Sequence, residues 1–368
     1  MTSILILCRE DNLTWVNAGY ARALRRAGVR LHCVPWGTPF NANLHELIEQ
    51  CPEKPDYIFH PETDFPLLPW GLAEVDIPTV IFHTDPYAYT HRRVRWSRLF
   101  DHVVLLHFGF EDCFKQAGNP RPMTLVHAVD VEYFEGPPIE RVFEVSSVGR
   151  TEGENYTTRR EMLTELSATF RTNEWWRLHP YEEMAMTYRA SKIVLNIPRD
   201  DFPVDVSLRF AEAMAAGALF IARSPSELPS LGFEENIHFV AFRERSEVPG
   251  LLRCYLKDEK ARGRIAEAGR EKVLREHTYN RRAKTLLELL ERDGCRLHAP
   301  ARRWSEERVR LLYLDFFSAQ RCLEHAWLEW RKIAGGGLRE AAAGAALLLR
   351  AWTRWPRRQV NADAPHSS

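Results

Sequence analysis

Short, continuously apolar segments alternate with helix-like segments in this chain. The first apolar segment is Ile4 to Leu7, and after a polar loop a helix-like stretch runs from Asn17 to Ala27, ends at Gly28 and is followed by Val29 to Val34. A short apolar run of this kind is typical of a strand buried on both faces of a parallel sheet. The alternation therefore predicts strand–helix–strand units in an α/β fold.

The alternation starts twice. The first part continues with strand-like segments at 57–59, 79–82, 103–106 and 124–126. Gly136, Pro137 and Pro138 then interrupt regular structure and suggest a hinge. The second series contains strand-like segments at 143–148, 193–195 and 218–222 and helix-like segments at 159–170 and about 208–216. At about 150 residues per domain, the 368 residues fit two Rossmann-like, doubly wound lobes with a cleft between them.

We expect the first lobe to span residues 1–138, the second 139–295, and a helical basic extension 296–368. Apolar residues at helical spacing in 251–255 and 279–290 predict two helices that close the second lobe. The apolar stripe of 309–333 predicts helices that cover both lobes. Apolar residues and arginines share 338–358, where the apolar core is far short of the roughly 20 residues of a membrane span. This segment fits a helix on a membrane surface, or one packed on the protein itself or a partner.

Charge and cysteine content exclude several classes of protein. Fifty basic and fifty acidic residues cancel, so the whole chain has no general attraction for nucleic acid. From Arg296 onward, thirteen Lys and Arg face seven Asp and Glu, which gives this part a charge of +6. The seven cysteines are scattered and form no Cys-x-x-Cys pair, so we expect neither disulfides nor a zinc site. No signal peptide is recognisable at the start, and we expect a cytoplasmic protein.

Several common catalytic motifs are absent. The chain has neither Gly-x-Gly-x-x-Gly nor the P-loop pattern, which argues against a dinucleotide dehydrogenase and a P-loop NTPase. It also lacks His-Glu-x-x-His and Gly-x-Ser-x-Gly, which argues against a zinc metallohydrolase and a serine hydrolase. The remaining candidates are polar residues that follow predicted strands.

The most specific candidates lie in the stretch 205–222. We expect Ser207 to cap a helix that ends at Gly217 before a buried strand. Arg209 and Glu212 are three residues apart and share a face of this helix, at the sheet edge where doubly wound folds bind ligands. Free backbone N–H groups at a helix start suit a diphosphate, and a carboxylate can accept both hydroxyls of a ribose. The alternative is a surface ion pair between Arg209 and Glu212.

Candidate residues of the first lobe also follow predicted strands. His83 and Asp85 come after the strand at 79–82 and are candidates to orient or deprotonate a substrate hydroxyl. The alternative is that His83 caps a strand end. Asn17 and Gly19 open the first helix, where a sugar or phosphate can approach closely. We expect these residues to face the cleft.

Two longer stretches resemble the C-terminal lobe of group 1 glycosyltransferases. The first is Ser-Leu-Arg-Phe-Ala-Glu-Ala-Met-Ala-Ala-Gly-Ala from Ser207, and the second is the charged helical segment from Tyr255 to Tyr279. Within this family, the chain is most similar to the CgeB-like, spore-maturation branch. The similarity covers about 143–292 well and 78–134 more loosely. It implies a GT-B fold, a UDP- or GDP-linked sugar donor in the second lobe, an acceptor in the first, no metal, and retention at the anomeric carbon.

The resemblance also assigns roles to residues. It implies that Glu212 binds the donor ribose, and that Arg150, with Arg159 or Arg160, offsets the diphosphate charge, a role for which Arg209 is a further candidate. The loop 179–181, with Tyr181, would lie near the base. A solvated helix face is the alternative for Arg150 and Arg159. Relatives carry a second Glu eight positions before the ribose Glu, where this chain has Val204, with Asp205 beside it.

We therefore predict an enzyme that moves a sugar from a nucleoside-diphosphate sugar to a hydroxyl of a glycan, a lipid-linked saccharide or a protein. A membrane-linked acceptor would give the segment 338–358 a role at the inner face of a membrane. Two alternatives remain: a catalytically silent sugar-binding scaffold, which the Val204 departure favours, and a sugar-nucleotide epimerase.

Overall fold

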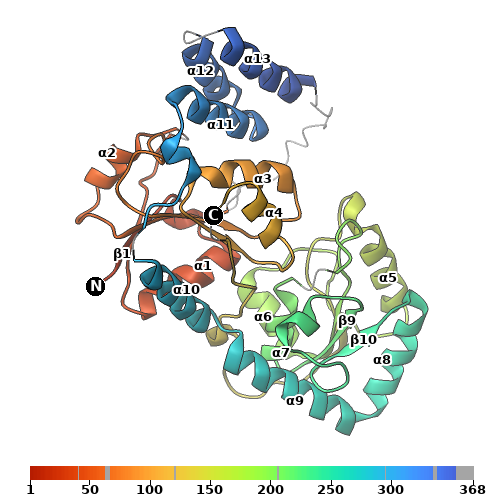
Figure 1. Cartoon of the computed structure of the whole chain (residues 1–368). Helices are drawn as coiled ribbons and strands as arrows, with labels where there is room; N and C mark the ends of the chain where they lie inside the picture. The colour runs from red at the N-terminus through yellow and green to blue at the C-terminus, as the bar shows by residue number, and fades with distance from the viewer. Residues whose placement is uncertain are drawn as a thin grey trace.

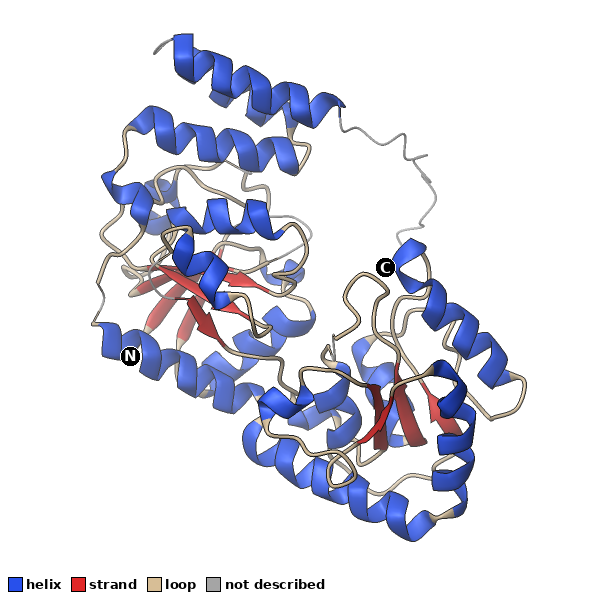
Figure 2. Cartoon of the chain, turned by 45° about the vertical axis from the view of Figure 1, so that its right-hand side comes forward, coloured by secondary structure: helices blue, strands red, loops and turns tan. Residues whose placement is uncertain are grey.

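The structure is a computed structural model that describes residues 1–39, 41–62, 67–119, 122–204, 207–294, 296–334 and 338–353. Two lobes, each a sheet with helices on both faces, lie side by side (Figure 1, Figure 2). Among these residues the first sheet has the order β2-β1-β3-β4-β5-β6 and the second β10-β9-β8-β7. Each pair of neighbouring strands is parallel. The prediction of two Rossmann-like sheets is confirmed.

Alternating apolar residues of the first sheet supply two separate cores. Leu5 and Leu7 belong to the core on one face, and Ile4 and Ile6 to the core on the other, because successive side chains of a strand point to opposite faces. The strands are β1 (Ser3–Ile6), β2 (Arg30–Cys33), β3 (Tyr57–His60), β4 (Thr79–His83), β5 (His102–Leu105) and β6 (Pro122–Thr124). The helices are α1 (Trp15–Arg26), α2 (Leu44–Glu49), α3 (Thr90–Trp96) and α4 (Glu111–Gln116).

The second lobe is built in the same way. Ile193 and Leu195 of its sheet face one core and Val194 the other. Its strands are β7 (Phe143–Ser146), β8 (Ser191–Asn196), β9 (Leu219–Arg223) and β10 (Val240–Phe242). Its helices are α5 (Thr157–Ser167), α6 (Tyr181–Arg189), α7 (Arg209–Ala215), α8 (Val248–Lys257) and α9 (Glu259–Glu276). Gly217 ends α7 with a positive φ of 69°, as the sequence predicts.

The chain crosses from one lobe to the other twice, and the two crossing segments lie side by side. The N–H of Val129 donates to the carbonyl of His277, and the N–H of Tyr279 donates back to Val129, at 2.9 and 3.1 Å. Thr278 caps the following helix α10 (Tyr279–Asp293), because its side chain accepts from the N–H of Arg281. Helix α10 packs against α1 in the first lobe, and its apolar residues belong to the first-lobe core that contains Ile4 and Ile6. The expectation that this helix closes the second lobe is wrong, because its apolar face complements α1.

The helical extension packs on the first lobe. It consists of α11 (Glu306–Ala319), α12 (Leu323–Ala334) and α13 (Leu338–Thr353). Apolar residues of α11 and α12 join the first-lobe core that also contains Leu5 and Leu7. Figure 1 shows these helices above the first lobe and away from the second. The expectation that the stripe covers both lobes is therefore wrong.

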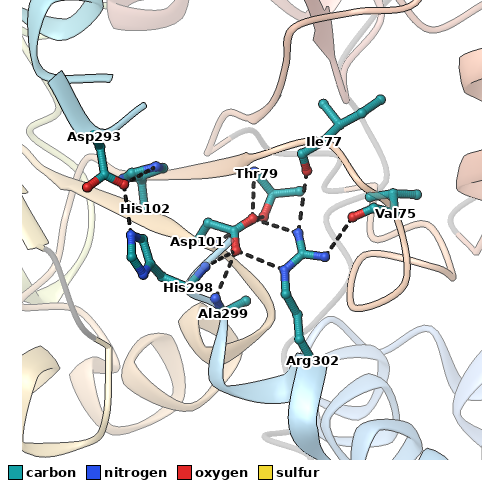
Figure 3. Close-up of polar contacts among 9 residues, drawn as sticks. All are labelled: Val75, Ile77, Thr79, Asp101, His102, Asp293, His298, Ala299 and Arg302. Atoms are coloured by element: carbon teal, nitrogen blue, oxygen red, sulfur yellow. Dashed lines mark hydrogen bonds and ion pairs between the residues drawn. The ribbon is translucent and has the colours of Figure 1, made fainter. Parts of the chain in front are cut away.

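A buried polar cluster attaches the extension at the sheet edge where β4 and β5 begin (Figure 3). Arg302 binds both carboxylate oxygens of Asp101, at 2.9 and 2.7 Å, and donates to the carbonyl of Val75 at 2.6 Å. Asp101 also accepts from the backbone N–H groups of His298 and Ala299. Burial opposes ionisation of Asp101, but the hydrogen bonds and charge of Arg302 prevail and hold its pKa below the usual value.

Helix α13 lies against α11 and α12. Gly344 permits this contact, because a Cβ there would lie 2.9 Å from Cδ1 of Trp330. The helix thus packs on the protein itself. Of the described helices, none has the length and apolar character needed to cross a membrane. Arg354, Arg357 and Arg358, which belong to the predicted membrane-surface segment, lie outside the described residues.

Candidate functional site

A cavity of about 580 Å³ lies between the lobes, at the ends of strands from both sheets. Loops after β3, β4, β5 and β6 and the start of α1 form the first-lobe wall. The loop after β7 and parts of α6 and α7 form the second-lobe wall. Of the predicted site residues, the cavity is lined by Asn17, Asp85, Arg150, Ser207, Arg209 and Glu212.

Glu212 is the most unusual group in this cavity. Its residue is 3% exposed, and its Oε1 has no hydrogen-bond partner among the described residues. Burial raises the pKa of Glu212 to about 7, against the opposing effects of the positive charge of Arg209 and the hydroxyl of Tyr181. A buried carboxyl with an unpartnered oxygen is suited to accept hydrogen bonds from a ligand. The alternative of a surface ion pair with Arg209 is wrong, because Glu212 is buried.

Arg209 is held in place by three acceptors. Its Nε donates to the carbonyl of Val148 at 2.6 Å, and one terminal nitrogen donates to Asn196 Oδ1 at 3.1 Å and Ser207 Oγ at 2.9 Å. Gly149 makes room for the guanidinium, since a Cβ there would lie 2.1 Å from a terminal nitrogen of Arg209. Leu208 rather than Ser207 occupies the N-cap position of α7, so the capping expectation is wrong. Ser207 instead fixes Arg209.

Arg150 lines the cavity, whereas Arg159 is buried behind the loop that carries Arg150. Arg150 is exposed and lines the cavity from the loop after β7. Arg159 is 2% exposed, and its guanidinium donates to the carbonyls of Ile197 and Arg150, at 2.8 and 2.7 Å. Arg160 donates to the carbonyl of Thr151. Arg159 therefore holds the loop that carries Arg150, and it is neither part of the cavity wall nor a solvated helix residue.

The first-lobe wall contains Asn17, Asp85 and a residue that sequence reasoning missed, Glu62. The carboxylate of Glu62 accepts from the N–H and hydroxyl of Thr84, at 2.6 and 3.0 Å, and forms an ion pair with Arg93. The amide of Asn17 donates to the backbone carbonyl of Glu62 at 2.7 Å. No local pattern marks Glu62, because it lies in a loop and acquires its partners from other loops.

Two predicted residues of the first lobe are not among the described residues that line the cavity. His83 is buried, and its ring contacts Ser97 Oγ at 2.8 Å and Arg93 at 3.3 Å. Burial, Arg93 and His60 lower its pKa well below the usual value, so the ring is neutral and enclosed. A Cβ on Gly19 would lie 2.3 Å from the ring of Tyr279, so Gly19 lets α1 and α10 approach. The predictions that His83 and Gly19 face the cleft are therefore wrong.

Two further histidines line the cavity and were missed. His107 and His127 follow strands β5 and β6, at the sheet edge that the strand-end rule already indicates. His107 Nδ1 lies 2.6 Å from Glu227 Oε2 of the second lobe, so this contact joins the two lobes. The rings of His107 and His127 are 5.1 Å apart. Burial, His107 and Arg282 lower the pKa of His127 well below its usual value, so its ring is neutral.

Tyr181 lines a second, adjoining cavity of about 290 Å³. Thr14 and Trp15 border both cavities. Val204 is not among the described lining residues, and Asp205 lies outside the described part of the chain. Within that part, no group of three or more His, Cys, Asp and Glu side chains is placed to hold a metal ion.

Comparison with known proteins agrees with this architecture. Residues 153–288 match the family described as Glycosyl transferase-like. Anabaena HepE in complex with UDP is 12% identical, with a TM-score of 0.54 over 79% of this chain and 100% of that chain. A sucrose-phosphate synthase from Thermosynechococcus elongatus is 11% identical, with a TM-score of 0.55 over 79% and 99%. A glycosyltransferase from Rickettsia africae is 12% identical, with a TM-score of 0.52 over 79% and 98%.

No curated protein sequence matches the chain. The identities of the similar structures are low enough that the likeness concerns the fold alone. The matched family segment contains α7 with Arg209 and Glu212. The chain has the two-lobed GT-B fold of glycosyltransferases, followed by a helical part, and its residues 153–288 carry a glycosyl transferase-like sequence.

Proposed function

We propose that this protein is a glycosyltransferase that takes a sugar from a nucleoside-diphosphate donor and transfers it to a hydroxyl group. The observation that carries the proposal is Glu212, a residue that lines the cavity between the lobes of a GT-B fold and whose buried carboxyl has an unpartnered oxygen. The glycosyl transferase-like segment around it and the UDP complex of HepE support the same function.

Three residues of the second lobe would hold the donor. The carboxylate of Glu212 accepts hydrogen bonds from the ribose hydroxyls, and Arg209 and Arg150 supply positive charge beside the diphosphate. The diphosphate gains negative charge as the glycosidic bond breaks, so a positive group fixed beforehand lowers the barrier. Arg209 is fixed in this way, because Val148, Asn196 and Ser207 hold its guanidinium. In this proposal arginines, rather than a metal ion, neutralise the leaving group.

The acceptor would bind against the first-lobe wall. Asp85 is the candidate that orients the acceptor hydroxyl, because it lines the cavity while His83 is enclosed. The acceptor classes of the sequence analysis, namely a glycan, a lipid-linked saccharide and a protein, stay in the proposal. Retention at the anomeric carbon, the CgeB-like branch and contact of 338–358 with a membrane surface also stay predictions.

Calorimetric titration with UDP and GDP tests the donor site. In Glu212→Gln, one carboxylate oxygen becomes an amide nitrogen that cannot accept, so we expect the dissociation constant to rise about tenfold to hundredfold. Glu267→Gln is the matched control, because Glu267 is an exposed second-lobe residue paired with Arg270. Equal affinities of the Glu212 and Glu267 variants for both nucleotides would contradict the proposal.

Turnover separates the proposed enzyme from its alternatives. Release of UDP or GDP from the corresponding nucleotide sugars, with a glycan acceptor present, is expected to require Glu212. Nucleotide binding without turnover would favour the silent scaffold, which the valine at position 204 supports. Formation of an isomerised free sugar nucleotide would identify an epimerase.

A further inference from the structure

The second cavity lies between the lobes, and three aromatic residues are among the described residues that line it. Trp15 comes from the start of α1, Tyr133 from the connection between the lobes, and Tyr181 from the start of α6. The rings of Tyr133 and Tyr181 are 4.8 Å apart and nearly perpendicular. The edge of Trp15 meets Tyr181 at 5.6 Å and 78°. Both lobes therefore contribute flat apolar surface to one space.

Trp15 has an unusual conformation for a large residue. Its φ is +47°, in the left-handed region that bulky side chains rarely adopt because of steric strain. The residue is 48% exposed although it borders two cavities. The residue is half-exposed beside two cavities, so a ligand that covers its ring would bury apolar surface.

The second cavity lies where the base of a nucleotide would point. Glu212 would hold the ribose, and Arg209, beside Gly149, would hold the diphosphate. The hydroxyl of Tyr181 interacts with Glu212 and its ring lines the second cavity, so this cavity begins next to the ribose position. The base and the diphosphate are attached to opposite ends of a ribose. A ribose on Glu212 with its diphosphate on Arg209 therefore directs its base toward Tyr181 and Trp15.

We infer that Trp15 stacks on the nucleobase of the donor, so that the first lobe adds a contact to a nucleotide whose ribose and diphosphate the second lobe holds. This inference rests on the proposed function. Every nucleobase has a flat face that can stack on an aromatic ring, and such stacking contributes strongly to binding. Because Trp15 and Tyr181 belong to different lobes, a bound base also links the lobes on this side of the cavity.

A comparison of two ligands tests this role. UDP and ribose 5-diphosphate differ by the base alone, and their dissociation constants are measured for the wild type, Trp15→Ala and Trp15→Phe. We expect Trp15→Ala to weaken UDP binding about tenfold or more and to leave ribose 5-diphosphate unchanged. Trp15→Phe retains a stacking ring and is expected to lose much less. GDP serves as a second base-containing ligand, with the same pattern expected.

Trp36→Ala is the matched control. Trp36 is an exposed first-lobe residue stacked under Arg9, and it is not among the described residues that line either cavity. Its removal is expected to leave both affinities unchanged. Tryptophan fluorescence gives a second readout, because a stacked base quenches the indole. UDP should quench the wild type and the Trp36→Ala variant more than Trp15→Phe, whereas ribose 5-diphosphate should quench none of them.

Two outcomes would overturn the role of Trp15. One is unchanged UDP affinity in Trp15→Ala. The other is an equal loss for UDP and ribose 5-diphosphate, which would show that the ring shapes the site as a whole. If Glu212→Gln weakens UDP binding while Trp15→Ala does not, the proposed function stands and this inference fails. If neither UDP nor GDP binds the wild type, the proposed function fails first and the inference fails with it.

Discussion

The two walls of the central cavity each present a glutamate, and the two glutamates are held in different ways. Glu62 of the first lobe is paired with Arg93 and accepts from Thr84, so its charge is already compensated. Glu212 of the second lobe is buried with an unpartnered oxygen, so a ligand can complete its hydrogen bonds. The difference fits the proposed donor site on the second-lobe wall, whereas Glu62 fixes loops of the first-lobe wall.

The largest expected effect tests the second wall. Arg209→Ala removes a positive charge held beside the proposed diphosphate position, and we expect kcat/KM for sugar transfer to fall about thousandfold. Arg209→Lys should recover little, because an ammonium cannot reproduce the three directed contacts of the guanidinium. Steady-state kinetics with circular dichroism as a folding check measure this effect. Arg245→Ala, which alters a surface pair with Glu161, is the control. Full activity of the Arg209→Ala variant would contradict the proposed donor site.

The next effect is the pH dependence of stability that Glu212 introduces. Its pKa is about 7 in the folded protein and 4.5 in the reference state, so the folded protein holds the proton more tightly. The stabilising contribution of Glu212 to the free energy of unfolding is fully present below pH 4.5. It falls by about 3 kcal/mol as the pH rises to 7 and is constant above that pH. Urea unfolding of the wild type and Glu212→Gln between pH 4.5 and 8 measures the difference. Parallel curves for the two proteins would contradict the raised pKa.

The smallest effect addresses the first wall. Asp85→Asn removes a carboxylate that lines the cavity opposite the donor residues. We expect sugar transfer to slow about tenfold to hundredfold, while the dissociation constant of UDP stays unchanged. Transfer kinetics and UDP titration on the same preparation measure both quantities. A matching loss of UDP affinity would place Asp85 on the donor rather than the acceptor side and would weaken the contrast between the walls.

Local patterns predicted most of the second wall. Arg209, Glu212 and Gly217 belong to one short helix and its ending, so residues a few positions apart determine their arrangement. The same patterns placed the strands of both sheets, except β10, within a few residues of their observed ends. Ser207 shows the limit of this reasoning, because its side chain is bound by Arg209 and does not cap the helix.

The first wall could be predicted only in part. The strand-end rule indicated Asp85 correctly, yet it also selected His83, whose side chain turns inward to Ser97. His107 and His127 satisfy the same rule after the next two strands and were not identified. Residues at a sheet edge alternate between core and cleft, so this rule gives the edge and not the orientation of each side chain.

The sequence by itself determined two parallel α/β sheets, the helix that carries Arg209 and Glu212, and the helical extension, because periodicity and glycine placement act over a few neighbouring residues. Tertiary structure alone decided that α10 and the extension pack on the first lobe, that Glu227 reaches His107, and that Trp15 meets Tyr181. These contacts join residues far apart in the chain, and they depend on how complementary surfaces pack once the elements have formed.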